Sequence, residues 1–197
     1  MGWEGVNLGF GFTGSFCTYE KVMPAMEELI REKANVIPVF SDATATMDTR
    51  FGKAKDWKAR VEELTGKEII RTIVDAEPIG PKGLVDLMII APCSGNSMAK
   101  LANGITDDPV LMAAKAHLRN DRPVLLGIAT NDGLGNNAKN LAYLLNAQNI
   151  FLVPFGQDDP YRKVNSLVSH MDLILPAGEC TLQGEQMQPV IQSYNQD

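Results

Sequence analysis

Four short stretches of this chain combine glycine, hydroxyl and amide residues, the groups with which proteins bind anionic ligands. They are Thr13 to Ser15, Ser41 to Thr46, Cys93 to Ser97 and Thr130 to Asn137. Hydroxyls and free backbone N–H groups suit a phosphate, above all where a helix begins. The expected chemistry is therefore the binding of a phosphorylated ligand by hydrogen-bond donors, because the chain has no block of Lys and Arg.

The third of these stretches follows the most continuous apolar run of the chain. Leu84 to Ala91 is typical of a strand buried on both faces of a parallel sheet, and Pro92 is expected to end it. Cys93 to Ser97 then leads into a helix that begins at Met98. This order places donors at the carboxyl edge of a sheet, where open α/β folds bind ligands. An ordinary connection, with Asn or Ser capping the helix, has the same pattern.

Apolar runs and helical periodicity predict the elements that must position these stretches. The predicted strands cover 6–12, 36–40, 69–74, 84–91, 123–129 and 150–154. Besides the helix that begins at Met98, helices are predicted over 18–32, 56–65, 110–119 and 139–148. We therefore predict an α/β fold: a single-domain, Rossmann-like, doubly wound sheet of six mainly parallel strands in the order 3-2-1-4-5-6.

In such a sheet the four polar stretches converge on one crevice, which makes a ligand site there the favoured interpretation. The core is expected over about residues 6–155. Residues 156–197 are expected to form a helical or irregular extension, with a helix over 166–175.

The first predicted strand and its turn carry a G-x-G-x-x-G spacing at Gly9, Gly11 and Gly14. A dinucleotide site would also need an acidic residue at the end of the second strand to bind a ribose. Asp42 comes one or two residues too late for that role and lies among hydroxyl residues. The spacing therefore fits a single phosphate better than a dinucleotide.

Composition excludes several classes of protein. A net charge of −6 over 197 residues makes nucleic acid and anionic membranes unsuitable partners. Neither a signal peptide nor a bilayer-spanning run is visible, so a cytoplasmic location is expected. The three cysteines, Cys17, Cys93 and Cys180, are odd in number and widely spaced, which argues against disulfides and against a bound metal.

The stretch from Pro92 to Ser97, with Ala99-Lys100, Ala102, Gly104-Ile105 and Asp107, resembles the Pro-x-Ser-x-Asn-Thr-x-x-Lys-x-Ala-x-Gly-x-x-Asp signature of FMN-binding flavoproteins. That family includes cysteine decarboxylases and flavin prenyltransferases, and the resemblance covers about residues 6–155. It implies bound FMN. The FMN-binding residues that it implies are Thr13, Gly14, Ser15, Ser41, Thr44, Pro92, Ser94, Gly95, Asn96, Ser97, Thr130 and Asn131.

The chain departs from the decarboxylases of the family at two places. The position of their catalytic His falls at Pro78, and their substrate clamp is replaced by Ala129 to Asn136. Decarboxylation is therefore not expected, and no catalytic residue is assigned. His117 and His170, the two histidines, are expected to be structural or surface residues.

Within the family, the chain most closely resembles an oxidoreductase subunit that acts with an NAD(P)-binding partner subunit on a small dicarboxylate. The stretches that carry this resemblance are Gly9 to Glu20, Thr49 to Gly52, Pro92 to Asp107 and Val153 to Asp158. Arg50 and Lys53 could neutralise such a substrate, or they could belong to a solvated loop. The resemblance also implies a homo-oligomer, a trimer or a multiple of trimers. Two alternatives stay open: a non-catalytic flavin- or ligand-binding partner, and a flavin-dependent reductase or prenyltransferase.

Overall fold

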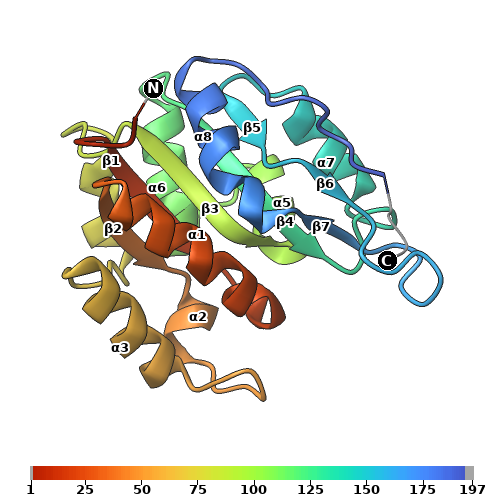
Figure 1. Ribbon diagram of the computed structural model, residues 1–197, viewed down its shortest axis with the longest axis horizontal. Helices are drawn as coiled ribbons and strands as arrows, with labels where there is room; N and C mark the ends of the chain where they lie inside the picture. The colour runs from red at the N-terminus through yellow and green to blue at the C-terminus, as the bar shows by residue number, and fades with distance from the viewer. Residues whose placement is uncertain (1, 194–197) are drawn as a thin grey trace.

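A mostly parallel sheet of seven strands forms the centre of the molecule (Figure 1). The computed structural model describes residues 2–193. The parallel strands are β1 (Asn7–Phe12), β2 (Asn35–Phe40), β3 (Leu87–Ser94), β4 (Val124–Thr130) and β5 (Ile150–Leu152). Two short strands, β6 (Phe155–Gly156) and β7 (Leu167–Ser169), pair with each other and β7 pairs with β4, both antiparallel.

The outer edge of β4 is shared between two strands. Its first half, Val124–Leu126, pairs with β5, and its last two residues, Ala129 and Thr130, pair with β7. The path across the sheet is therefore β2-β1-β3-β4-β7-β6, with β5 beside β7 on the same edge of β4. This fork brings the chain after residue 155 back to the carboxyl end of β4.

Helices cover both faces of the sheet, as a doubly wound fold requires. On one face α1 (Tyr19–Arg31), α3 (Ala54–Thr65) and α8 (Ile174–Leu182) share a buried apolar cluster with the sheet. On the other face the cluster involves α4 (Ile73–Ala76), α5 (Gly95–Ala102), α6 (Pro109–Leu118) and α7 (Ala138–Leu145). Figure 1 shows α1 and α8 in front of the sheet and α6 and α7 behind it.

The remaining helices are short. They are α2 (Asp42–Thr46) and three 3₁₀ turns at Phe16–Thr18, Glu77–Ile79 and Met171–Leu173. Within residues 2–193, no helix is both long and apolar enough to cross a lipid bilayer.

The predicted fold class is confirmed, but the predicted strand over 69–74 is wrong. Only Ile70 pairs with the sheet, in a single parallel bridge to Val39 beyond β2. The strand stops because Thr72 caps α4: its hydroxyl accepts a hydrogen bond from the Asp75 N–H at 3.0 Å. The predicted order 3-2-1-4-5-6 therefore holds for β2, β1, β3, β4 and β5, with the outermost strand reduced to this bridge.

Pro92 does not end the central strand, contrary to the prediction. β3 continues to Ser94, and its register against β4 shifts between Ile90 and Cys93. The helix then begins at Gly95 instead of Met98, because the Ser94 hydroxyl accepts a hydrogen bond from the Ser97 N–H at 3.2 Å.

The predicted helix over 166–175 is also wrong in its first half. Leu167–Ser169 forms β7, a 3₁₀ turn follows at Met171–Leu173, and α8 begins only at Ile174. Ser169 explains part of this: its hydroxyl accepts from the Ile128 N–H at 2.9 Å and donates to the Val153 carbonyl at 3.0 Å. Strand pairing with β4 therefore decides the local structure here.

Candidate functional site

A cleft of about 450 Å³ opens at the carboxyl ends of β1, β2 and β3. Five of the predicted FMN-binding residues line it: Gly14, Ser41, Ser94, Asn96 and Ser97. The other lining residues are Phe16, Asp42, Ala43, Met47, Lys100, Asp107 and Asp108. Three of the four polar stretches thus meet at one cleft of a size common for small-molecule sites.

The hydroxyls of the first stretch are used within the protein. Thr13 is buried; its Oγ1 donates to the Pro92 carbonyl at 2.7 Å and accepts from the Ser94 N–H at 2.8 Å. Ser15 Oγ donates to the Ala129 carbonyl at 2.7 Å. These bonds tie the end of β1 to β3 and to β4, so Gly14 is the residue of this turn that lines the cleft.

The second stretch presents one hydroxyl to the cleft and keeps another inside. Ser41 caps α2, accepting from the Thr44 N–H at 3.3 Å, and it lines the cleft although only 3% of its surface is exposed. Thr44 is buried behind it and donates to the Phe12 carbonyl at 3.0 Å. Thr44, a predicted FMN-binding residue, therefore does not line the cleft and is linked to it only by its hydrogen bond with Ser41.

The third stretch places the N-terminal turn of α5 at the cleft. Ser94 is the cap, and its hydroxyl also donates to Ser97 Oγ at 3.0 Å. Gly95 turns away from the cleft toward β4: a Cβ there would lie 2.5 Å from Thr130 Oγ1. The exposed Asn96 completes the turn and lines the cleft.

The fourth stretch supports α5 from behind and does not line the cleft. Thr130 Oγ1 donates to Asp132 Oδ1 at 2.5 Å, and Asn137 Nδ2 donates to both Asp132 oxygens at 2.8 and 3.0 Å. These hydrogen bonds lower the pKa of the Asp132 carboxyl. Asn131 is exposed. Thr130 therefore packs behind Gly95, and neither Thr130 nor Asn131 lines the cleft.

Charged groups close the cleft on the side of α6. Lys100 Nζ binds both carboxylate oxygens of Asp107, at 2.8 and 2.7 Å. Asp108 caps α6 by accepting from the Leu111 N–H at 3.0 Å, and burial raises the pKa of its carboxyl. Lys100 and Asp107 belong to the family signature found in the sequence, but the sequence did not show that these two residues and Asp108 line the cleft.

The predicted substrate residues lie elsewhere. Arg50 and Lys53 are exposed in the loop between α2 and α3, and neither lines the cleft. The Arg50 guanidinium lies 4.8 Å from the centre of the Phe51 ring. Their role toward a dicarboxylate stays a prediction.

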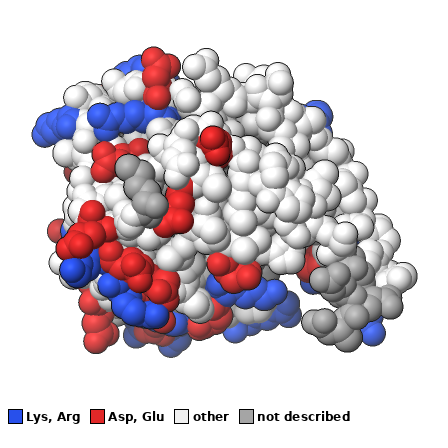
Figure 2. Space-filling model, turned by 45° about the horizontal axis from the view of Figure 1, so that its top comes forward, with Lys and Arg blue, Asp and Glu red and all other residues white. Residues whose placement is uncertain are grey.

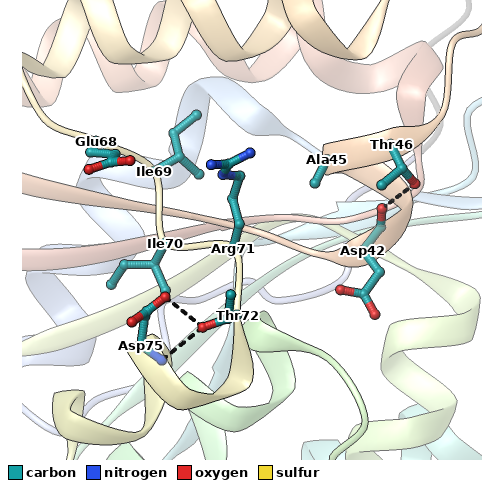
Figure 3. Close-up of a pocket in the computed structure, with 9 residues that line it drawn as sticks. All are labelled: Asp42, Ala45, Thr46, Glu68, Ile69, Ile70, Arg71, Thr72 and Asp75. Carbon is teal, nitrogen blue, oxygen red and sulfur yellow. Dashed lines mark hydrogen bonds between the residues drawn. The ribbon is translucent and has the colours of Figure 1, made fainter.

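A second groove, of about 540 Å³, shares only Asp42 with the cleft (Figure 3). The labelled side chains show Arg71 reaching up between Ile69 and Ala45, and Thr72 bonded to Asp75 below. The polar turns that follow β1 and β3 do not line this groove. The smaller cleft is therefore the better candidate for a phosphorylated ligand.

A family model described as Flavoprotein matches residues 3–170, which is most of the chain. The chain belongs to this family. The chain is 54% identical over 188 residues to the B subunit of dipicolinate synthase of Bacillus subtilis (strain 168). The match covers 95% of this chain and 94% of that protein.

Similarity to solved structures supports the same family. The B subunit of dipicolinate synthase from Bacillus halodurans superposes with a TM-score of 0.90 at 47% identity, covering 98% of this chain and 99% of the other. The FMN-dependent cysteine decarboxylase SpaF gives a TM-score of 0.64 at 19% identity, covering 92% and 98%. The latter likeness shows the shared fold.

Proposed function

We propose that this chain is the FMN-binding B subunit of a dipicolinate synthase, and that the cleft at the ends of β1, β2 and β3 holds the flavin. The observation that carries the proposal is the cleft itself: turns from three strands meet there with hydroxyl, amide and glycine residues. The 54% identity to the Bacillus subtilis protein, over 95% of the chain, supports the assignment.

The residues present fit FMN. Ser41, Ser97 and Asn96 offer hydroxyl and amide groups, and Gly14 leaves the backbone of the first turn open to a phosphate. Phe16 and Met47 give apolar cover, which an isoalloxazine ring needs. Lys100 neutralises Asp107 in the same cleft, so the donors are not opposed by that carboxylate.

The reaction we propose is the oxidation of dihydrodipicolinate to dipicolinate in the cytoplasm of a spore-forming bacterium. FMN, when bound, supplies a hydride acceptor for such an aromatisation. This chain binds and orients the flavin, and an A subunit contributes an NAD(P) site. Arg50 and Lys53 are proposed to meet the two carboxylates of the substrate, and Pro78, where the decarboxylases have His, is inconsistent with decarboxylation.

One observation favours a second candidate, a non-catalytic flavin-binding partner. Among the described residues that line the cleft, the groups that could transfer a proton are Asp42, Asp107, Asp108 and Lys100. Lys100 and Asp107 are bonded to each other, and the Asp108 carboxylate caps α6. In that case this chain holds the ligand and the partner subunit carries out the chemistry.

The test compares Gly14→Asp with Gly14→Asn. The nearest atom to a Cβ at Gly14 is Ala43 Cβ at 3.7 Å, so both side chains can enter, and they differ only in charge. We expect Gly14→Asp to bind FMN roughly tenfold more weakly than Gly14→Asn, because its carboxylate repels the phosphate. Riboflavin, which has no phosphate, should not distinguish the two variants. Flavin absorbance and fluorescence titrations measure both affinities.

Turnover of dihydrodipicolinate with purified A subunit then separates the two candidates. Product formed only when both subunits and FMN are present supports the oxidoreductase subunit, whereas product formed equally well without FMN supports the non-catalytic partner. Absence of FMN binding by the wild type at micromolar concentrations overturns the flavin proposal.

A further inference from the structure

Tyr19 carries a buried hydroxyl directly behind the cleft. The residue begins α1 and is only 1% exposed. Its hydroxyl has one proton and two acceptors within reach, the Thr13 carbonyl at 3.0 Å and Thr44 Oγ1 at 2.8 Å. Thr44 Oγ1 in turn lies 3.0 Å from Ser41 Oγ, and Ser41 lines the cleft. A continuous row of three hydroxyls therefore leads from the core to the site.

The backbone acceptors beside this row are already satisfied. The Thr13 carbonyl accepts from the Ser15 N–H at 2.7 Å, and the Phe12 carbonyl accepts from the Ser41 N–H at 3.0 Å. Neither carbonyl depends on a hydroxyl proton. The protons of Tyr19 and Thr44 can therefore point along the row, since a hydroxyl both donates and accepts.

The direction of the row decides what Ser41 can do. If Tyr19 donates to Thr44 Oγ1, and Thr44 gives its own proton to Ser41 Oγ in place of the Phe12 carbonyl, the Ser41 proton is free to be donated into the cleft. If Thr44 lacks a donor, its oxygen is the nearest acceptor for the Ser41 proton, which then points inward. A buried oxygen left without a donor is costly, so the inward orientation is then favoured.

We infer that Tyr19 is a positioning residue for the phosphate of the ligand: its hydroxyl donates to Thr44, which leaves Ser41 free to donate to an anion in the cleft. The inference rests on the proposed FMN site. Burial raises the pKa of the Tyr19 phenol, so the hydroxyl stays protonated over the whole physiological range. Hydrogen bonds in such a row also polarise one another, which strengthens the last one toward an anion.

The test is a double-mutant cycle between Tyr19→Phe and Ser41→Ala, read as the ratio of the FMN and riboflavin dissociation constants. We expect Tyr19→Phe to weaken FMN binding about tenfold with little change for riboflavin. In the Ser41→Ala background the same substitution should have no further effect, because the hydroxyl through which it acts is gone. Loss of packing alone would weaken both ligands in both backgrounds.

Thr44 provides an independent test of the middle of the row. Thr44→Ser keeps the hydroxyl and should bind FMN like the wild type, whereas Thr44→Val removes it and should reproduce Tyr19→Phe. This pair decides the question if Tyr19→Phe does not fold. Tyr143→Phe, at an exposed position on α7, is the matched control and should leave both constants unchanged.

A folded Tyr19→Phe or Thr44→Val protein with the wild-type ratio of FMN to riboflavin affinity overturns the inference. An equal loss of FMN affinity with and without Ser41 does so too. Failure of the proposed function is a different result, because the wild type itself would then not bind FMN.

Discussion

His117 is a fully buried imidazole on α6, and within residues 2–193 neither ring nitrogen has a hydrogen-bond partner. Burial, with the nearby Arg122 cation, lowers its pKa to about 4. The folded state therefore favours the neutral form, and the unfolded chain binds the proton first. This contribution to stability is complete above pH about 6.5 and is lost as the pH falls toward 4.

We expect the wild type to lose on the order of 3 kcal/mol more unfolding free energy between pH 7 and pH 4 than His117→Leu does. Urea unfolding at both pH values measures the difference. His170→Leu, at an exposed histidine, should retain the wild-type pH dependence. Equal losses in the wild type and His117→Leu would contradict the prediction.

At the residue scale, the sequence predicted which side chains lie near the site better than it predicted their hydrogen-bond partners. Ser41, Ser94 and Asn96, three of the predicted FMN-binding residues, line the cleft, and their binding of FMN stays a prediction. The hydroxyls of Thr13 and Ser15 instead donate to backbone carbonyls of β3 and β4. Such bonds join segments distant in the chain, so local spacing carries no sign of them.

At the scale of elements, the first turn of α5 depends on close packing at Gly95. A Cβ at this residue would lie 2.5 Å from Thr130 Oγ1 and 2.9 Å from Asn137 Nδ2. We expect Gly95→Ala to destabilise the fold by about 1–3 kcal/mol, because α5 must move away from the polar cluster behind it. Inside a helix this substitution is ordinarily stabilising. Thermal or urea unfolding measures whether Gly95→Ala lowers or raises the free energy of unfolding.

Gly14→Ala is the control, since a Cβ there meets nothing closer than 3.7 Å. It should change the unfolding free energy little. A Gly95→Ala protein as stable as the wild type would show that α5 is not held in place by this contact. FMN affinity should fall with stability in Gly95→Ala, because Ser94 and Asn96 move with the helix.

Long elements with clear periodicity were predictable, and short ones were not. Helix α1 and strands β1, β2 and β4 lie within one or two residues of their predicted bounds. The prediction that Pro92 ends the central strand was wrong because a register shift lets β3 continue through this residue. The strands β6 and β7 have only two and three residues, too few for a pattern, and they form because β4 offers an edge.

At the scale of the whole molecule, charge is unevenly spread. Figure 2 shows a broad face with few charged side chains beside one crowded with both signs. Residues 140–157, which include most of α7 and all of β5, contain no Lys, Arg, Asp or Glu. Interface cores are poor in charge and rich in aromatic residues, and Tyr143 on α7 is 62% exposed. Copies that each carry a net charge of −6 approach most easily through such a surface.

The family resemblance implies a homo-oligomer, a trimer or a multiple of trimers of the 21.5 kDa chain, and we expect the copies to meet through this surface. Light scattering should show that Tyr143→Glu lowers the mass. Val74→Glu, which changes an exposed residue near Arg71 and Asp75, should not. A monomeric wild type would contradict the prediction, and so would a loss of mass in Val74→Glu but not in Tyr143→Glu.

The fork at β4 also sets when the support behind the site can be completed during synthesis. Ser15 bonds to Ala129, 114 residues further along, and the Ile128 N–H bonds to Ser169, 41 residues beyond it. A nascent chain that has emerged only as far as β5 has its first turn and its central strand, but the carboxyl end of β4 still lacks its β7 neighbour. Contacts so distant in the chain form late. The support that the end of β4 gives to α5 therefore belongs to the finished polypeptide, although the residues that line the cleft, Gly14 to Asp108, emerge earlier.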